Sequence, residues 1–257
     1  MKKSEPIKSR SAANSRRARR SATHFRTTFS EHTMTYGNSV ASPGARVFIL
    51  QVPSEDPVSF SFVASSLRPE LVRVIAEAYL HTGSWDSAKV QVLSTNALQA
   101  RSASSAKRME RELRQRLMRL TTAEINLAAH GVIEERTAIA WLAALKSSRY
   151  IHAFASEFLR GTLASLDPVL RASDYEAFFE NQSAIHPEIL ALTSSSRTKV
   201  RTVLLAMVRD SGIGRAAGRE LRIQRPIVPP ATRSAIIADS PRWLAGFLVP
   251  DSEIPQE

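Results

Sequence analysis

The stretch IEERTAIAWLAALKSSRYIHAFASEFLRGTL, residues 133–163, decides the fold class. Its large apolar residues recur at helical spacing and cover most of a helix circumference, namely Ile139, Trp141, Leu142, Leu145, Tyr150, Ile151, Phe154, Phe158 and Leu159. A helix that is apolar nearly all round is buried on most of its sides. We therefore expect a central helix over residues 133–163, with a break near Ser147, in a largely helical protein.

Helix start and stop signals precede this stretch. Pro69 suits the first turn of a helix whose apolar residues recur at helical spacing, and Gly83 suits its end. Thr121 and Glu124 form a capping-box pattern, and Gly131 is expected to end the short helix that follows them. These signals predict that helices also make up the part of the chain before residue 133.

Similar signals follow the central stretch. Asp167 and Pro168 predict a cap followed by a first helical turn, and SDYE at residues 173–176 predicts a capping box. Hydroxyl residues from Thr193 onward precede a further helix, which DSGIG at residues 210–214 is expected to end. The C-terminal half is therefore also expected to be mostly helical.

The fold class that these patterns predict is all-α, with a short β element near the C-terminus. LRIQRPIVPP at residues 221–230 is β-branched and proline-rich, which indicates a strand or extended segment. Ser240 and Pro241 then open a final short helix. We expect a basic leader and linker over residues 1–56, a single helical domain over 57–250 and a tail over 251–257.

Positive charge is concentrated at the beginning of the sequence. The chain carries a formal net charge of +11, and residues 1–33 hold nine Lys or Arg against two Glu, a net charge of +7. This segment has few large apolar residues, so we expect it to be disordered, because burial cannot offset its ordering entropy. Three interpretations remain open: a nucleic-acid-binding arm, an organellar transit peptide, or translation that begins at Met34.

Catalytic and metal-binding patterns are not found in the sequence. The chain has no cysteine, which excludes disulfides, thiolate metal sites and a cysteine nucleophile. Its six histidines lack the spacing and acidic partners of a zinc helix. Asp174, Glu176 and Glu180 are explained by an acidic helix start. We expect a protein that is not an enzyme and has no catalytic residues, no cofactor and no metal.

Hydropathy gives an expectation of location. No run approaches the roughly 18 consecutive apolar residues that span a bilayer. No apolar segment of the kind that follows the basic start of a secretory signal is present either. The expectation is a cytoplasmic protein without membrane contact, and its positive charge favours anionic partners.

The most basic helical stretch is LQARSASSAKRMERELRQRLMRL, residues 98–120. On a helical wheel one stripe of it is apolar and is expected to pack on the core: Met109, Leu113, Leu117 and Leu120. At i, i+4 spacing, Glu112 can pair with Arg108 or Arg116, and Glu110 can pair with Arg114.

Part of this stretch is expected to face outward with uncompensated charge. Arg111 lies nearly opposite the apolar stripe and has no acid within helical reach, so Lys107, Arg111 and Arg114 are predicted to form a positive stripe. Arg101 and Ser102 lie at the helix start, where free N–H groups and the helix dipole favour a phosphate.

SSSRTKVR, residues 194–201, repeats the arrangement of hydroxyls followed by cations at a second helix start. A solvated helix face is the alternative explanation for both stretches. The residues predicted to contact DNA phosphates are Arg101, Ser102, Lys107, Arg108, Arg111, Arg114, Arg197, Lys199 and Arg201.

Ordered blocks of this sequence resemble the BrxA family, an accessory protein of bacterial BREX phage-defence systems. The blocks are SFSFVASSLRPELVRVIAEAYL, Trp85, NALQARSASSAKRMERELRQRL, YIHAFASEFLRG and TKVRTVLLAMVRDSGI, within residues 59–249. The resemblance implies a helical bundle similar to the antitermination factor NusB, no known catalytic residues, DNA binding, and action beside a methyltransferase and ATPases. The leader over residues 1–33 departs from the family pattern.

Three hypotheses of function follow. The first is a non-catalytic component that binds the phosphates of duplex DNA. Duplex is favoured over single strand because the sequence lacks the interleaved aromatic residues on which unpaired bases stack. RNA remains an alternative partner because the resemblance to NusB implies it. The third is a scaffold that holds other BREX proteins together, its basic face meeting acidic protein.

Overall fold

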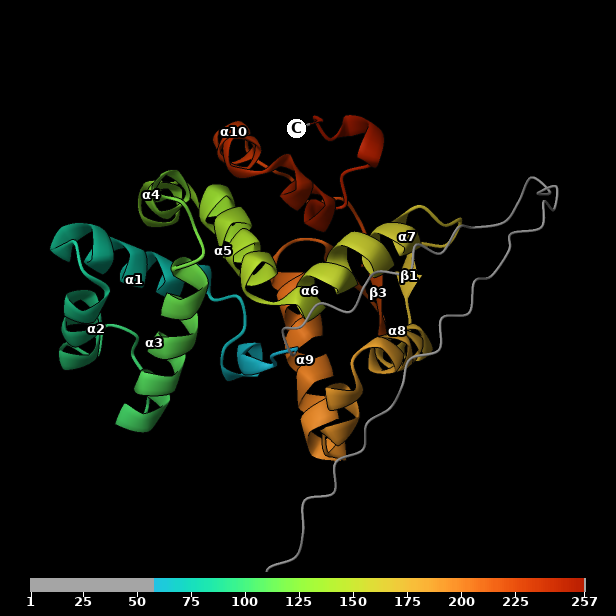
Figure 1. Cartoon of the computed structure of the whole chain (residues 1–257), viewed down its shortest axis with the longest axis horizontal. Helices are drawn as coiled ribbons and strands as arrows, with labels where there is room; N and C mark the ends of the chain where they lie inside the picture. Colours follow the sequence, from blue (N-terminus) through green and yellow to red (C-terminus); the bar gives the residue numbers. More distant parts are fainter. Residues whose placement is uncertain (1–57, 257) are drawn as a thin grey trace, which may run out of the picture. The chain divides into compact units, whose positions relative to one another are not determined.

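The stretch over residues 133–163 folds as a succession of helical segments in the computed structural model, which describes residues 58–256 (Figure 1). The segments are α5 (Ile133–Ser147), α6 (Arg149–Ala153), the π-helix η2 (Phe154–Leu159) and α7 (Arg160–Leu163). The break predicted near Ser147 lies at Ser148, whose backbone is extended and whose Oγ accepts a hydrogen bond from the Ile151 N–H at 3.4 Å. Trp141 and Leu142 of α5 are fully buried, as expected for a central helix.

In the described part of the chain, five elements precede α5. They are η1 (Ser61–Ala64), α1 (Pro69–Thr82), α2 (Trp85–Ser94), α3 (Ala103–Leu117) and α4 (Thr122–His130). Three of them, α1, α3 and α4, pack against α5. Helix α1 contacts α2, α3, α4 and α5. Gly83 ends α1 with a φ of 67°, a left-handed conformation that suits glycine. The capping box of α4 is confirmed, since Thr121 N–H donates to Glu124 Oε2 at 2.8 Å and Glu124 N–H donates to Thr121 Oγ1 at 3.3 Å.

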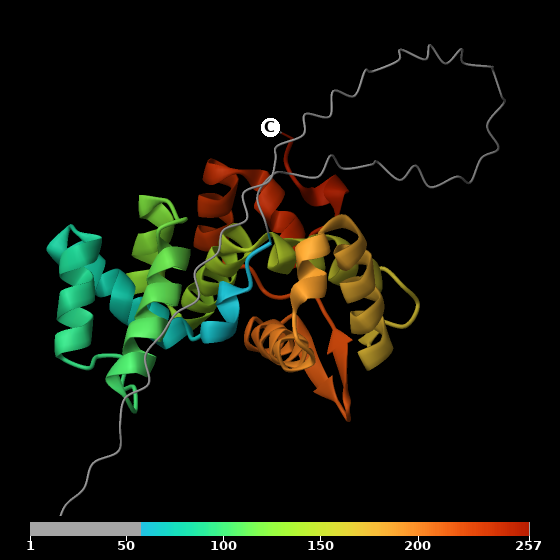
Figure 2. The same cartoon turned by 60° about the horizontal axis from the view of Figure 1, so that its bottom comes forward.

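A small antiparallel sheet and two long helices follow α7. These elements are β1 (Val169–Leu170), α8 (Ala172–Ile185), η3 (Pro187–Ala191), α9 (Ser194–Asp210), β2 (Gly214–Ala217) and β3 (Glu220–Ile223). The strand order is β1-β3-β2, with Val169 opposite Arg222 and Gly214 opposite Ile223. Figure 2 shows the β2–β3 hairpin beside α9, which contacts β2. The short β element predicted near the C-terminus is therefore confirmed in β3.

Two predictions around α8 are wrong. Asp167 and Pro168 do not begin a helix but lead into β1, whose pairing with β3 is not encoded locally. The capping box predicted at residues 173–176 lies earlier, because α8 already begins at Ala172 and the Arg171 N–H donates to Asp174 Oδ2 at 2.7 Å.

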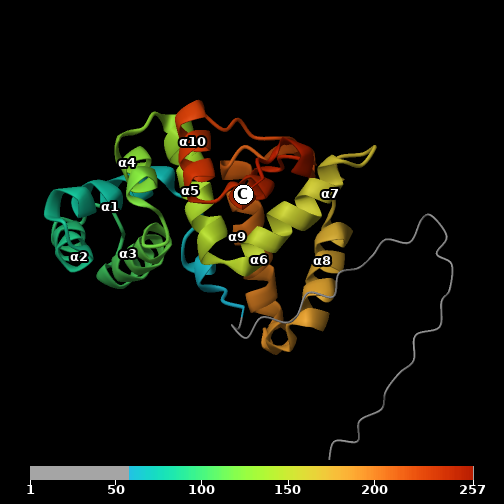
Figure 3. The same cartoon turned by 45° about the horizontal axis from the view of Figure 1, so that its top comes forward.

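The C-terminal elements cover the central helix. They are α10 (Pro230–Asp239), the 3-10 helix η4 (Pro241–Phe247) and the 3-10 helix η5 (Asp251–Glu253). Figure 3 shows α10 across α5 and beside α4, and α10 contacts both. The sequence did not predict α10, whose first residue ends the stretch expected to be extended. The final short helix was expected, and Trp141 Nε1–H donates to the Gly246 carbonyl of η4 at 2.9 Å.

A buried ion pair fixes η1 to α3. Arg116 and Glu112 are almost completely buried, and Arg116 Nε donates to Glu112 Oε1 at 2.9 Å. The two Nη atoms of Arg116 donate to the carbonyl oxygens of Phe62, Ser65 and Ser66 at 3.3, 2.7 and 3.0 Å. The guanidinium therefore satisfies both a buried carboxylate and the carbonyl groups where η1 ends.

The segment η1 also links α3 to the second half of the chain. It contacts both α3 and α9, and all three views place it between these helices (Figures 1, 2 and 3). Phe60 and Phe62, at its start, pack on Tyr150 of α6 with ring centroids 5.0 and 6.5 Å away. Tyr150 in turn packs on Phe178 of α8 at 5.2 Å.

We predict that Arg116→Ala lowers the free energy of unfolding by about 3–5 kcal/mol, because it leaves Glu112 buried without its partner. Urea denaturation followed by circular dichroism measures this change. Arg111→Ala, at an exposed position of the same helix, is the control and should change stability by less than about 0.5 kcal/mol. Equal effects of the two substitutions would contradict the structural role of Arg116.

Candidate nucleic-acid interface

The first candidate region is the start of α3. Ser102 is the N-cap residue, and its Oγ accepts a hydrogen bond from the Ser105 N–H at 3.2 Å. The Ser102 hydroxyl also lies 3.2 Å from Ser104 Oγ and donates to Ser105 Oγ at 3.0 Å. Arg101 and Ser102 are both exposed. The helix start is thus a cluster of hydroxyls beside the positive end of the helix dipole.

The start of α9 has the same arrangement. Thr193 is the N-cap residue, and its Oγ1 accepts from the Ser196 N–H at 3.2 Å. Its hydroxyl lies 3.1 Å from Ser195 Oγ and donates to Ser196 Oγ at 3.0 Å. The two helix starts predicted from the sequence are therefore built alike, and Figure 1 shows both directed toward the lower edge of the view.

The outward face of α3 carries cations without acidic partners. Lys107, Arg108 and Arg111 are exposed, and within residues 58–256 none of them forms an ion pair. Glu112, which could have paired with Arg108, pairs with the buried Arg116 instead. Positive charge on this face is therefore not neutralised by the helix itself.

The prediction that Arg114 belongs to this free stripe needs correction. Its Nε donates to Glu110 Oε1 at 2.6 Å, and the Glu110 side chain is only 1% exposed. The Arg114 side chain is itself 17% exposed. Arg114 therefore neutralises a buried carboxylate, which is the i, i+4 pair that the spacing also allowed.

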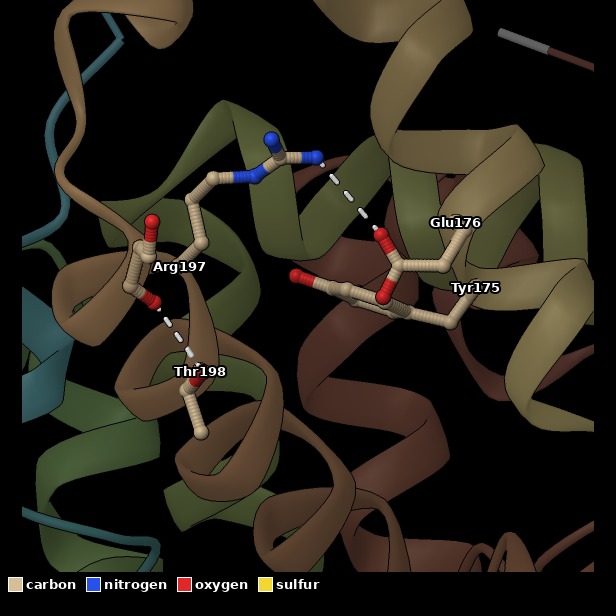
Figure 4. Close-up of a pocket in the computed structure, with 5 residues that line it drawn as sticks. Tyr175, Glu176, Arg197 and Thr198 are labelled. Atoms are coloured by element: carbon tan, nitrogen blue, oxygen red, sulfur yellow. Dashed lines mark hydrogen bonds and ion pairs between the residues drawn. The ribbon is translucent and has the colours of Figure 1, made fainter.

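Two of the three predicted cations of α9 share one acid. Arg197 and Arg201 approach the two carboxylate oxygens of Glu176 on α8 at 3.6 and 3.5 Å. Figure 4 shows Arg197 and Glu176 facing each other across a cavity of about 270 Å³ that Tyr175 and Thr198 also line. Lys199 is exposed and, among residues 58–256, has no acidic partner.

Arg197 is further held by an aromatic ring, because its guanidinium lies 4.1 Å from the centroid of the Phe179 ring. The ion pairs of Glu176 with Arg197 and Arg201 are long and partly exposed, so Glu176 holds the two arginines only weakly. The role of Glu176 could not be read from the sequence, where it stood only as part of an acidic helix start.

The predicted residues thus form two groups, one on α3 and one on α9, with η1 between the two helices. Sequence reasoning missed three further exposed cations, Arg119, Arg149 and Arg242, which lie around two other cavities. They come from three different segments, so no spacing pattern could have grouped them.

Two other kinds of site are absent from the described part of the chain. Within residues 58–256, no three His, Asp or Glu side chains gather as metal ligands do. None of the helices in that range is long and apolar enough to cross a bilayer.

The sequence of this chain is similar to those of known proteins. The family model BrxA matches residues 58–240, which is most of the described chain. The chain belongs to the BrxA family. The "BREX protein BrxA" of Escherichia coli O9:H4 (strain HS) is 27% identical over 140 residues, which cover 54% of this BrxA-family chain and 66% of that protein.

A solved structure supports the fold independently. The crystal structure of an uncharacterized protein from Magnetospirillum magneticum matches with a TM-score of 0.67 and 16% sequence identity. The match covers 75% of this BrxA-family chain and 98% of the other protein. At this level of identity the likeness shows a shared fold.

We predict that Arg114→Gln destabilises the protein, whereas Arg111→Gln does not. Removing the Arg114 charge leaves Glu110 buried without its partner, at a cost of about 1–3 kcal/mol. Arg111 has no such partner, so its substitution should change the free energy of unfolding by less than about 0.5 kcal/mol. Thermal unfolding of the two variants side by side measures the difference, and equal midpoints would show that the Arg114–Glu110 pair contributes nothing.

Proposed function

We propose that this protein is a non-catalytic, duplex-DNA-binding component of a BREX phage-defence system. Membership of the BrxA family and similarity to a protein named as a BREX component support the role in BREX defence. Such a role would be exercised in the cytoplasm, beside the other BREX proteins, among them a methyltransferase and ATPases.

The observation that carries DNA binding is the exposed face of α3. Lys107, Arg108 and Arg111 lie there with no acidic partner among residues 58–256. Unpaired cations on a helix neutralise phosphates and release condensed counterions, which supplies most of the affinity of sequence-independent binding. Phosphate contacts of this kind position a protein without reading bases, so little sequence preference is expected.

The preference for duplex rests on the side chains of the same face. Helix α3 contains no aromatic residue, so it offers no ring on which an unstacked base could lie. An RNA duplex presents the same phosphates in a different geometry, and a direct comparison of the two duplexes decides between them.

We predict that the triple variant Lys107→Gln, Arg108→Gln, Arg111→Gln binds duplex DNA about tenfold or more weakly at matched salt. The slope of log affinity against log salt should become shallower by about 0.9 for each phosphate that the variant no longer neutralises. Fluorescence anisotropy of a labelled duplex, titrated at several salt concentrations, measures both quantities.

The matched control is Arg215→Gln, Arg219→Gln, Arg222→Gln on the exposed β2–β3 hairpin, which removes the same charge elsewhere. The control should keep most of the affinity. If both triple variants lose affinity equally, net charge alone drives binding. If neither loses affinity, α3 is a solvated face and the basic surface is free to meet acidic protein.

We further predict that Glu176→Gln strengthens duplex binding by about two- to fivefold, because exposed ion pairs are worth about 0–1 kcal/mol. The substitution frees Arg197 and Arg201 and removes a charge that repels phosphate. Glu180→Gln removes an exposed acid from the same helix and is the control. The same anisotropy assay applies, and an equal gain in both variants would exclude a specific role for the α9 arginines.

A further inference from the structure

A cavity of about 530 Å³ has no role in the proposed DNA binding. It lies among the end of α5, α6, η2, α8 and η4, and none of the predicted DNA-binding residues lines it. Its volume is within the range of about 300–1,000 Å³ that is typical of small-molecule sites. The cavity is therefore a candidate site separate from the starts of α3 and α9.

One part of the cavity is cationic. Arg149 and Arg242 are exposed at its rim and, among residues 58–256, have no acidic partner. The Arg242 guanidinium lies 4.9 Å from the centroid of the Trp243 ring, which orients it. Lys146 also lines the cavity, but its charge is balanced by Glu124 and Asp239 at 2.6 and 2.9 Å. Two cations therefore remain available to an anion.

The acids near the cavity do not neutralise these arginines. Glu157 lines the cavity without an ion pair in the described part of the chain, and burial raises the pKa of its carboxyl. Glu188 is held elsewhere, accepting a hydrogen bond from the Val58 N–H at 2.9 Å and lying 3.6 Å from His186.

A neighbouring cavity extends the positive surface. It measures about 340 Å³ and shares Lys146, Arg242 and Trp243 with the larger cavity. Arg119 lines it and has no acidic partner within residues 58–256. Arg119, Arg149 and Arg242 therefore line two cavities that have three residues in common.

One buried polar atom of the larger cavity lacks a hydrogen-bond partner among the described residues. His152 Nδ1 lies 3.4 Å from Ser156 Oγ, whereas His152 Nε2 is buried and has no hydrogen-bond partner among the described residues. Burial and the nearby Arg242 both lower the pKa of His152, which favours the neutral form of its ring. Buried polar atoms without partners are uncommon and call for a specific explanation.

The remaining walls suit the organic part of a ligand. Apolar side chains line them, and the cavity is bordered by the π-helix η2, a form of helix that is frequent at functional sites. The apolar residues are Val58, Leu145, Ala153 and Ile185. Gln182, on α8, adds an amide that can both donate and accept.

We infer that this cavity binds an organic phosphate of nucleotide size, with the phosphate between Arg149 and Arg242 and the organic part against Leu145 and Ile185. Arginine guanidinium groups bind phosphates by charge-assisted, often bidentate hydrogen bonds. The inference does not depend on DNA binding, because the residues differ.

Isothermal titration calorimetry on the full chain tests this inference with the four ribonucleoside 5′-monophosphates, adenosine and inorganic phosphate. At least one monophosphate should bind, and adenosine and inorganic phosphate should each bind about tenfold or more weakly. The variant Arg149→Gln, Arg242→Gln should weaken the monophosphate by a similar factor and leave the thermal midpoint unchanged, since both side chains are exposed. Lys107→Gln, Arg111→Gln is the control and should bind it like the parent.

Several results would overturn the inference. They are no binding of any monophosphate at millimolar concentration, unchanged binding by the Arg149 and Arg242 variant, or equal binding of adenosine. Equal binding of inorganic phosphate would show a bare anion site without a role for the apolar walls. Loss of duplex affinity in this variant, without any nucleotide binding, would assign both arginines to the DNA surface instead.

Discussion

The contacts of the Arg116 guanidinium are the constraint on which the rest of the structure depends. One side chain satisfies the buried Glu112 carboxylate and three carbonyl oxygens at the end of η1. Since η1 contacts α3 and α9, this interaction fixes the segment that lies between the two basic helices. The starts of α3 and α9 are distant in the sequence. Because η1 contacts both helices, it helps to fix their position relative to each other.

The positions of the two glutamates in α3 determine which of its cations are paired and which are free within the described part of the chain. Glu110 and Glu112 each lie four residues before an arginine, and each takes that arginine as its partner. Lys107, Arg108 and Arg111 are left on the outer face. The same short sequence therefore serves two purposes: its inner ion pairs stabilise the fold and its outer cations remain available for a ligand.

Local signals predicted much of this structure, and non-local pairing accounts for what they missed. The cap at Thr121 depends on Glu124, three positions away, so the sequence predicted it, and the hydroxyl residues from Thr193 likewise marked the start of α9. Strand β1 exists only because distant β3 pairs with it, and a two-residue strand has no pattern of its own. The sequence did not predict helix α10 because Pro230 lies in a proline-rich segment whose composition indicates an extended chain. Proline is nevertheless well suited to a first helical turn.

Non-local packing also explains why the sequence predicted the candidate sites only in part. The spacing showed that Glu110 could reach Arg114, but only the burial of Glu110 shows that the pair is obligatory. The two cavities beside Trp243 are lined by Arg119, Arg149 and Arg242, which come from different segments. Only tertiary packing brings these residues together, so the sequence could not predict the group.

The helices differ in the charge of their first turns, which affects both folding stability and the affinity for an anion. The first turns of α1, α2, α4, α5 and α8 each contain an acid, which the positive end of a helix dipole favours. The first turns of α3 and α9 contain none, as is also true of α6, α7 and α10, and cations follow the hydroxyl residues of α3 and α9. Cations near a helix start oppose the dipole, so this choice costs folding stability. A bound phosphate would supply the missing anion at both positions, which is why these two helix starts suit a polyanion better than the five that carry an acid of their own.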